Sequence, residues 1–198
     1  MFESLQKLKG VGNAAARGAM LPLLAAMRAE QVVQGPERAD AVFQAYSQAV
    51  SLLPGIPGEY FRRAFYALAL PRCGRDLTVG FGTVLSKRAV TVGDRVYVGM
   101  HCTIGQVDLG DHVTIGSNVD ILSGSRQHDF SDPEAVLQDQ PTTYVRVRIG
   151  ANTWIGNGTI VMADVGRSCV VGAGAVVVEP LPDRVIAVGN PARIVRER

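Results

Sequence analysis

The sequence has few aromatic residues, few cysteines and no long apolar run, and each shortage excludes a class of protein. Only 6% of its 198 residues are aromatic, and its three cysteines are far apart with no C-x-x-C pair. This cysteine usage argues against a disulfide scaffold or a zinc cluster and fits a reducing compartment. The apolar run Gly18–Met27 is too short to cross a bilayer. Because the start MFESLQKLKG lacks the pattern of a signal peptide, we expect a cytoplasmic protein.

The chain also has no large excess of either positive or negative charge. The chain carries 20 basic and 18 acidic residues, for a formal net charge of +2, which is too small a field to suggest nucleic acid as a partner. A hydrophobic fraction of 47% argues against disorder. What is abundant is glycine, with 22 residues. A core rich in small residues and low in rings suggests repetition, and the length suits one domain with a small appendage.

The N-terminal part has the pattern of helices. We expect one helix over roughly residues 13–34, a second from Pro36 to about Leu53 and a third from about Pro57 to Leu70. The helical pattern stops after Pro71. We therefore divide the chain into an N-terminal helical region, residues 1–75, and a second domain, residues 76–198.

The helical region carries no catalytic signature, but it contains a basic cluster. One interpretation is peripheral membrane contact, with anionic lipid head groups or a lipid-linked sugar phosphate as the ligand; the other is an ordinary solvated face. The cluster comprises Arg62, Arg63, Arg72 and Arg75, with Lys87 and Arg88 just after.

A six-residue period begins at Val92, in which an aliphatic residue precedes glycine. We expect each hexapeptide to form a short strand and a turn, with Gly or Asn adopting the turn conformation. Three units close a triangular coil of about 18 residues. Stacked coils give a mainly β fold, a left-handed parallel β-helix, which here follows an N-terminal α-helical region. The clearest pairs are Val92-Gly93, Val98-Gly99, Ile104-Gly105, Leu109-Gly110, Ile115-Gly116, Ile149-Gly150, Ile155-Gly156 and Val171-Gly172.

Three motifs in the repeat resemble those of the hexapeptide-repeat acyltransferases. They are TWIG at 153–156, VVGAGAVVV at 170–178 and AVGNPARIV at 187–195. The resemblance covers roughly Leu77 to Arg196 and is nearest to the sugar and surface-polysaccharide O-acetyltransferases, with galactoside, maltose and xenobiotic acetyltransferases as relatives. It implies acetyl-CoA or another acyl-CoA as donor and a homotrimer with active sites between subunits.

The repeat is interrupted between Ile121 and Ile149 by a polar segment, which we expect to leave the stack as an extended loop at about residues 123–146. The loop contains His128, which matches the catalytic histidine of the family. Acyl transfer to a hydroxyl needs a base with a pKa near neutrality, so His128 is the predicted general base. A carboxylate or a carbonyl would orient it. The candidate carboxylates, among which the sequence does not choose, are Asp120, Asp129, Asp132 and Glu134.

The resemblance also implies a set of residues that bind the coenzyme. Trp154, the only tryptophan, matches a family position beside the pantetheine arm and the acceptor; subunit packing is its alternative role. Arg193 suits phosphate because its guanidinium matches the geometry of that group. Glu179 stands where relatives often carry lysine, so Arg196 or Arg198 would replace that cation. The other matches are Asn157, Ala173 and Gly174 along the arm and Asn190 and Pro191 near the nucleotide.

The remaining histidines are weaker candidates. His112 occupies a turn position in LGDHVTIG, and His101 in VGMHCTIG either contacts the acceptor or lies on the coil surface. A carbonic-anhydrase-like metalloenzyme on the same helix would need two closely spaced histidines. Positions 101, 112 and 128 do not provide them, so we expect no metal.

Together these features predict an acetyl-CoA-dependent O-acetyltransferase that acts on a sugar or surface-polysaccharide hydroxyl by direct transfer. The enzymatic alternatives are a serine acetyltransferase and a xenobiotic (antibiotic) acetyltransferase. The non-enzymatic alternative is a β-helix scaffold subunit, which would not need His128, Trp154 and the GNPAR segment together. The expected partners are a small-molecule or saccharide acceptor and further copies of the chain.

Overall fold

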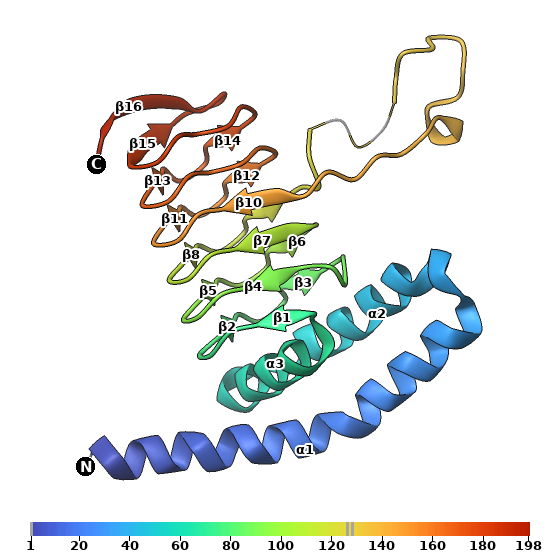
Figure 1. The fold of residues 1–198 in the computed structure, drawn as a ribbon, viewed down its shortest axis with the longest axis vertical. Coiled ribbons are helices and arrows are strands. Elements are labelled where there is room, and N and C mark those ends of the chain that lie inside the picture. The colour runs from blue at the N-terminus through green and yellow to red at the C-terminus, as the bar shows by residue number, and fades with distance from the viewer. Residues whose placement is uncertain (1, 126, 128) are drawn as a thin grey trace.

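The computed structural model describes residues 2–125, 127 and 129–198, and shows a stack of β-coils standing on a base of helices (Figure 1). The helices are α1 (Phe2–Gln34), a 3-10 turn η1 (Pro36–Arg38), α2 (Ala39–Ser51) and α3 (Gly55–Ala69). The three predicted helices are present, although α1 begins at Phe2 rather than near residue 13. Within the described residues, no helix combines the length and apolarity needed to cross a membrane.

The stack is a parallel β-helix of about six coils, so the predicted fold class is confirmed. One sheet has the order β1-β4-β7-β10, the second β2-β5-β8-β11-β13-β15-β16 and the third β3-β6-β9-β12-β14; we name them sheets A, B and C. All pairs are parallel except β15 with β16. The strands are β1 (Arg72–Cys73), β2 (Thr78–Val79), β3 (Val84–Leu85), β4 (Thr91–Val92), β5 (Tyr97–Val98), β6 (Thr103–Ile104), β7 (Val107–Leu109), β8 (Thr114–Ile115), β9 (Asp120–Ile121), β10 (Val147–Ile149), β11 (Trp154–Ile155), β12 (Ile160–Val161), β13 (Val170–Val171), β14 (Val176–Val177), β15 (Val185–Val188) and β16 (Arg193–Glu197).

The core consists of the aliphatic residues that precede glycine. In sheet B, Val98 pairs with Ile115, Ile115 with Ile155 and Ile155 with Val171, and all four are buried. The residue before each of them points outward, as expected from the two-residue period of a strand. Burial of this ladder of branched side chains, coil upon coil, is the main apolar contribution to the stability of the stack.

The coils shorten from the base of the stack to its C-terminal end. Thr78 pairs with Tyr97 in the lowest coils, and Tyr97 pairs with Thr114 one coil higher, across a shorter stretch of sequence. The stretch is shorter again in the upper coils, where Trp154 pairs with Val170. The single coil length that the hexapeptide period predicts is therefore an average of unequal coils.

The glycines of the aliphatic-glycine pairs serve close packing between coils, which corrects our expectation that glycine there adopts the turn conformation. A Cβ on Gly99 would lie 2.5 Å from the carbonyl carbon of Gly116 in the next coil. The left-handed conformation occurs two residues later, at His101 (φ 55°) and Asn118 (φ 57°). Each corner thus has one position that excludes a side chain and another that needs φ above zero.

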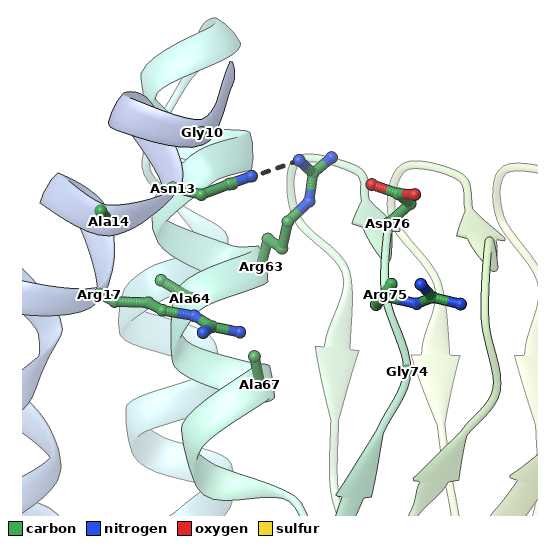
Figure 2. Close-up of a pocket in the computed structure, with 10 residues that line it drawn as sticks. All are labelled: Gly10, Asn13, Ala14, Arg17, Arg63, Ala64, Ala67, Gly74, Arg75 and Asp76. Carbon is green, nitrogen blue, oxygen red and sulfur yellow. Dashed lines mark hydrogen bonds between the residues drawn. The ribbon is translucent and has the colours of Figure 1, made fainter. Parts of the chain in front are cut away.

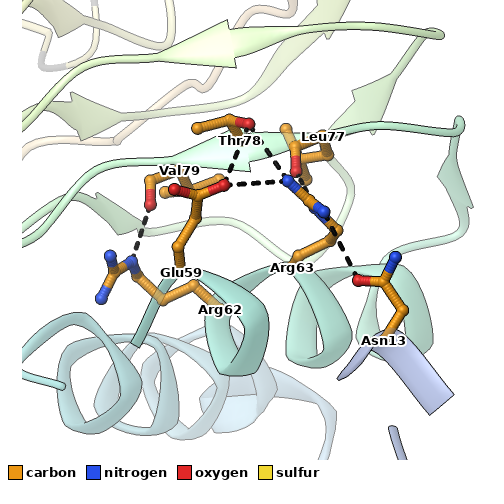
Figure 3. A network of polar contacts seen from close by, with 7 residues as sticks. All are labelled: Asn13, Glu59, Arg62, Arg63, Leu77, Thr78 and Val79. Carbon is orange, nitrogen blue, oxygen red and sulfur yellow. Dashed lines mark hydrogen bonds and ion pairs between the residues drawn. The ribbon is translucent and has the colours of Figure 1, made fainter. Parts of the chain in front are cut away.

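The helical base is attached to the first coil by polar contacts as well as apolar packing. Helix α1 lies beside α3 and forms a groove with it next to the first coil (Figure 2). From α3, Arg62 donates to the carbonyl oxygen of Val79 at 2.7 Å, and Arg63 donates to that of Leu77 (Figure 3). Arg63 also forms an ion pair with Glu59 at 2.9 Å.

For two residues of the basic cluster, Arg62 and Arg63, these contacts show that both interpretations, lipid contact and a solvated face, were wrong. Arg62 is buried, and Arg63 is partly buried with its guanidinium bonded to the first coil. Neither is therefore available to lipid head groups, and neither lies on a solvated face. Their physical role is to satisfy backbone carbonyls at the end of the stack, where a coil has no further coil beneath it.

Candidate active site

Three of the predicted coenzyme residues lie on the corner between sheets B and C. Asn157 lies in the turn between β11 and β12, and Ala173 and Gly174 lie in the equivalent turn one coil above. The amide of Gly174 donates to the carbonyl oxygen of Asn157 at 2.8 Å, so the two turns are directly stacked. Gly158 and Gly174 adopt φ of 67° and 70°, and a Cβ on either would meet no atom within 4 Å. This edge of the stack is therefore open and lined by backbone.

The side chain of Asn157 already has a structural partner. Its Oδ1 accepts a hydrogen bond from the amide of Ser117 in the coil below, at 2.9 Å. Asp111 and Asp183 accept in the same way from the amides of Asp94 and Arg167 at another corner. The amide oxygen of Asn157 thus belongs to the ladder that holds the coils together, which the sequence motif does not reveal.

The C-terminal segment continues the same corner upward. After β15, the carbonyl oxygen of Gly189 accepts from the amide of Val176 at 3.0 Å, and the amide of Ala192 donates to the carbonyl oxygen of Val176 at 2.8 Å. Asn190 and Pro191 therefore cross the top of sheet C, one coil above Gly174. Asn157, Ala173, Gly174, Asn190 and Pro191 form a single column, which we call the corner column.

Trp154 and Arg193 flank the corner column on the side of sheet B. Trp154 belongs to β11, is 52% exposed, and lies between Thr114 below and Val170 above. Arg193 begins β16, where it pairs with Val188, and its exposed guanidinium contacts only the neighbouring carbonyl oxygen of Ala192, at 2.9 Å, among the described residues. The structure thus brings the predicted coenzyme residues together at one edge of the upper coils.

The segment 122–146 between β9 and β10 projects away from the stack (Figure 1), and we call it the arm. The predicted base, His128, lies outside the described residues. Beside it in the sequence, the carbonyl oxygen of Gln127 accepts from the amide of Thr143 at 2.8 Å, and the amide of Asp129 donates to the carbonyl oxygen of Pro141 at 3.0 Å. The outgoing and returning segments of the arm are therefore bonded to each other.

The returning segment is attached to the lower coils by two charged contacts. The ammonium of Lys87 lies 3.6 Å from the ring centroid of Tyr144, a cation–π geometry. The guanidinium of Arg146 forms an ion pair with Asp108 at 2.6 Å and donates to the carbonyl oxygen of Ala89 at 2.8 Å. These contacts fix where the arm leaves the stack.

The candidate orienting carboxylates differ in their surroundings. Asp129 accepts from the amide of Ser131 at 2.9 Å, and this hydrogen bond holds the pKa of Asp129 below its ordinary value. Asp132 accepts from the amide of Glu134 at 3.0 Å. Asp120 is half-buried on β9 in sheet C. Asp129 and Asp132 thus stabilise local turns of the arm.

His101 and His112 both adopt left-handed backbone conformations at coil corners. The ring of His101 packs edge-on against Phe81, with centroids 5.7 Å apart, and His112 lies 3.4 Å from the guanidinium of Arg95. Among the residues that the structure describes, no group of three His, Cys, Asp or Glu side chains is arranged to hold a metal ion.

The arm and the corner column lie on different edges of one chain. The arm leaves at the corner between sheets C and A, whereas the corner column lies between sheets B and C (Figure 1). The sequence could not show this separation, because it depends on which corner of the triangle interrupts the period.

The comparisons with known proteins agree with the repeat fold. Residues 89–123 and 146–179 match the model of a protein family described as the hexapeptide repeat of succinyl-transferase, with the arm between the two matching blocks. These two blocks of the chain therefore carry the hexapeptide repeat that the family model describes. The galactoside O-acetyltransferase of Escherichia coli is similar to this chain, 32% identical over 114 residues, which are 54% of this chain and 54% of the relative. Of the first three curated relatives that it matches, the chain spans 53%, 36% and 56% of the length.

Two solved structures share the fold. A maltose O-acetyltransferase from Clostridium difficile has a TM-score of 0.70 at 22% identity, covering 80% of this chain and 87% of that chain. A mutant of AntD, an N-acyltransferase from Bacillus cereus, has a TM-score of 0.55 at 24% identity, covering 63% of this chain and 72% of that chain. At these identities the likeness concerns the fold.

Proposed function

We propose that the protein is an acetyl-CoA-dependent O-acetyltransferase that acetylates a hydroxyl of a sugar or a surface polysaccharide. The observation that carries this proposal is the corner column. It places the family's motif positions in three successive coils on one open edge, with Trp154 and Arg193 beside it. A scaffold subunit needs neither an open backbone edge nor an exposed tryptophan at this place.

The corner column suits the pantetheine arm of acetyl-CoA. Neighbouring strands of a sheet are about 4.8 Å apart, so a column spanning three coils extends for roughly 10 Å. Gly158 and Gly174 keep this edge free of side chains, which lets an extended chain with amide groups approach the backbone. Arg193 at the upper end supplies an exposed guanidinium for phosphate. AntD, on the same fold, was solved in complex with coenzyme A.

The separation of arm and column supports a site shared between copies. In a homotrimer, the arm of one copy would extend to the corner column of its neighbour, and His128 would face an acyl group that its own chain does not hold. The apolar ring of Phe130 on the arm, which is 68% exposed, would then be covered.

The proposed reaction is direct transfer. His128 takes the proton of the acceptor hydroxyl while the oxygen attacks the carbonyl carbon of the thioester. The tetrahedral intermediate collapses, the carbon–sulfur bond breaks, and the thiolate of coenzyme A receives the proton from His128. No covalent enzyme intermediate is required. Because acetyl-CoA is a cytoplasmic metabolite, we place the enzyme in the cytoplasm.

The test measures acetyl transfer through the release of thiol from acetyl-CoA. The panel of acceptors comprises galactosides, oligosaccharides, an amino sugar, L-serine and chloramphenicol. We expect a hydroxyl-bearing sugar to be the best acceptor, and His128→Ala to reduce the rate by about 10²–10⁴-fold. His112→Asn is the matched control, because asparagine also tolerates the left-handed conformation at that corner.

A His128→Ala rate equal to that of the wild type would refute the mechanism. Preference for the amino sugar would instead assign N-acyl transfer, the activity named for AntD.

A further inference from the structure

A groove at the base of the stack is not used by the proposed reaction. It lies between α1, α3 and the first two coils and consists of two adjoining cavities of 390 Å³ and 760 Å³, of which Figure 2 shows the smaller. The cavities share Gly10, Asn13, Arg63 and Asp76 in their linings, so they form one continuous depression. The helical region forms one wall of the groove, and the repeat motifs indicate no function for this region.

The groove has an excess of positive charge. Four arginines line it, Arg17, Arg63, Arg75 and Arg95, against the carboxylates of Glu59 and Asp76. Two of the arginines are already engaged: Arg63 pairs with Glu59, and Arg75 points away from the groove and pairs with Asp94 at 3.0 Å (Figure 2).

The other two arginines are available to a ligand. Arg17 is exposed on α1 and reaches toward the first coil, and among the described residues it has no hydrogen bond or ion pair. Arg95 lines the larger cavity, and its guanidinium has a single, long contact of 3.4 Å with His112 in the part of the chain that the structure describes. Each cavity therefore has one guanidinium group that is open to an anion, that of Arg17 in the smaller cavity and that of Arg95 in the larger.

Aromatic side chains connect the groove to the candidate active site. Tyr60 and Tyr97 line the larger cavity, and Tyr97 is 45% exposed on β5. Tyr97 pairs with Thr114, which pairs with Trp154, so the two rings stand on one face of sheet B with a single strand between them. Two strand spacings amount to about 10 Å. Exposed Tyr and Trp rings offer an apolar face together with a hydrogen-bonding edge.

We propose that the groove is a second saccharide subsite, which binds acidic sugar residues of a chain-like acceptor whose reacting hydroxyl lies near Trp154. The inference rests on the proposed function and specifies its substrate class as an acidic oligosaccharide or polysaccharide. Tyr97 stacks on a sugar ring in the larger cavity, where Arg95 binds a carboxylate or phosphate of the chain, and Arg17 binds that of a further sugar in the smaller cavity. Asn13 and Thr78 in the lining supply hydrogen bonds to hydroxyls.

The test is a binding titration of the full chain without acetyl-CoA. The probes are hexagalacturonate, a phosphorylated maltohexaose, neutral maltohexaose and inorganic phosphate. We expect one of the two charged oligosaccharides to bind best, and this result identifies the anionic group. Neutral maltohexaose and phosphate alone should bind at least tenfold more weakly, because the first has no anionic group and the second has no sugar ring.

Variants locate the binding. Arg17→Gln and Arg95→Gln should each weaken the binding of the charged oligosaccharide by about tenfold, and Tyr97→Ala by a similar factor. Arg38→Gln, an exposed arginine on η1 outside the groove, is the matched control and should leave binding unchanged. In the transfer assay, Arg17→Gln should raise the KM of the charged oligosaccharide and leave that of a short galactoside unchanged.

The inference is overturned if neither charged oligosaccharide binds, if the neutral chain or phosphate alone binds as well as they do, or if the three groove variants behave like Arg38→Gln. Failure of the proposed function looks different. In that case the oligosaccharide binds in the groove and responds to the variants, but no acceptor releases thiol from acetyl-CoA.

Discussion

In the middle of the coil stack the inward side chains are covered by the coils above and below them, whereas in the arm most apolar side chains face solvent. Ile155 is completely buried between Ile115 and Val171, while Leu137 on the arm is 60% exposed. The stack is joined by backbone hydrogen bonds from coil to coil. The arm is held by a few bonds between its own two segments and, at its root, by contacts of Tyr144, Arg146 and Ser123 with the coils.

This difference separates two tasks. The stack places backbone and small side chains at repeated, fixed positions, which suits the binding of a long, extended coenzyme. The arm is free of the repeat, so its side chains do not have to fit between coils, and the predicted base His128 falls within its sequence. A rigid scaffold with a functional loop attached is a common solution in proteins.

The largest expected difference between the two regions is in stability after removal of a buried side chain. Ile155→Ala should lower the free energy of unfolding by about 2–5 kcal/mol, because it leaves a cavity between coils. Leu137→Ala on the arm should change it by less than about 0.5 kcal/mol. Chemical denaturation at equal protomer concentration measures both, and equal losses would mean that the arm is packed like the stack.

The glycines of one corner provide a finer comparison within the stack. A Cβ on Gly156 would lie 2.5 Å from the amide nitrogen of Ala173, whereas a Cβ on Gly158 meets open space and costs only the strain of its positive φ. Gly156→Ala should therefore destabilise the protein by about 3 kcal/mol and Gly158→Ala by about 1 kcal/mol. Thermal unfolding of the two variants tests this order, and the reverse order would be inconsistent with the close approach of the coils.

In the helical base, a buried hydroxyl should contribute to stability, as the buried side chains of the stack do. Tyr66 Oη lies 2.7 Å from Ser47 Oγ, and the amide of Leu85 donates to Ser47 Oγ at 3.0 Å. Burial raises the pKa of Tyr66 to about 12. Because this exceeds the unfolded value of about 10, the stabilising contribution is complete below pH 10 and is lost as the pH rises toward 12.

Tyr66→Phe should accordingly cost about 1 kcal/mol at neutral pH and make the alkaline decline shallower. Denaturation between pH 8 and 11.5 follows both effects. An alkaline decline that is unchanged in the variant would show that another group causes it.

A small effect on stability is expected at the root of the arm. Tyr144→Leu and Arg146→Gln remove partly exposed contacts and should lower the free energy of unfolding by at most about 1 kcal/mol. Since these contacts position the arm, the transfer rate should fall more than the stability does. Denaturation and thiol release measured on the same preparations separate the two, and Leu137→Ala serves as the control on the same arm.

The parts of the molecule that follow the period could be predicted from the sequence. The inward position of Ile155 and the interruption by the arm both follow from a regular repeat. The grouping of Ala173 with Asn190 was implied by the resemblance to the acyltransferases and not by the repeat. The reason for glycine at Gly99 could not be predicted, since it depends on the distance to the next coil. The contact of Tyr144 with Lys87 was equally inaccessible, because the arm has no period that relates its residues to the coils.

The helical base illustrates the same limit. Its apolar spacing predicts helices, but the bonds from Arg62 and Arg63 to the first coil require the three-dimensional placement of α3 against carbonyls that have no coil beneath them. The sequence did not indicate a functional role for Tyr97 either. Its register with Trp154 appears only when β5, β8 and β11 are aligned.

The central claim is that the arm of one copy and the corner column of another make one active site, and complementation between two inactive variants tests it most directly. His128→Ala and Trp154→Ala are each purified, then mixed and refolded together, with differently tagged copies to confirm that mixed oligomers form. Random assembly of a site from two copies predicts that roughly a quarter of the wild-type rate returns. A rate no higher than that of the two variants measured alone, in oligomers shown to be mixed, would contradict a site shared between copies.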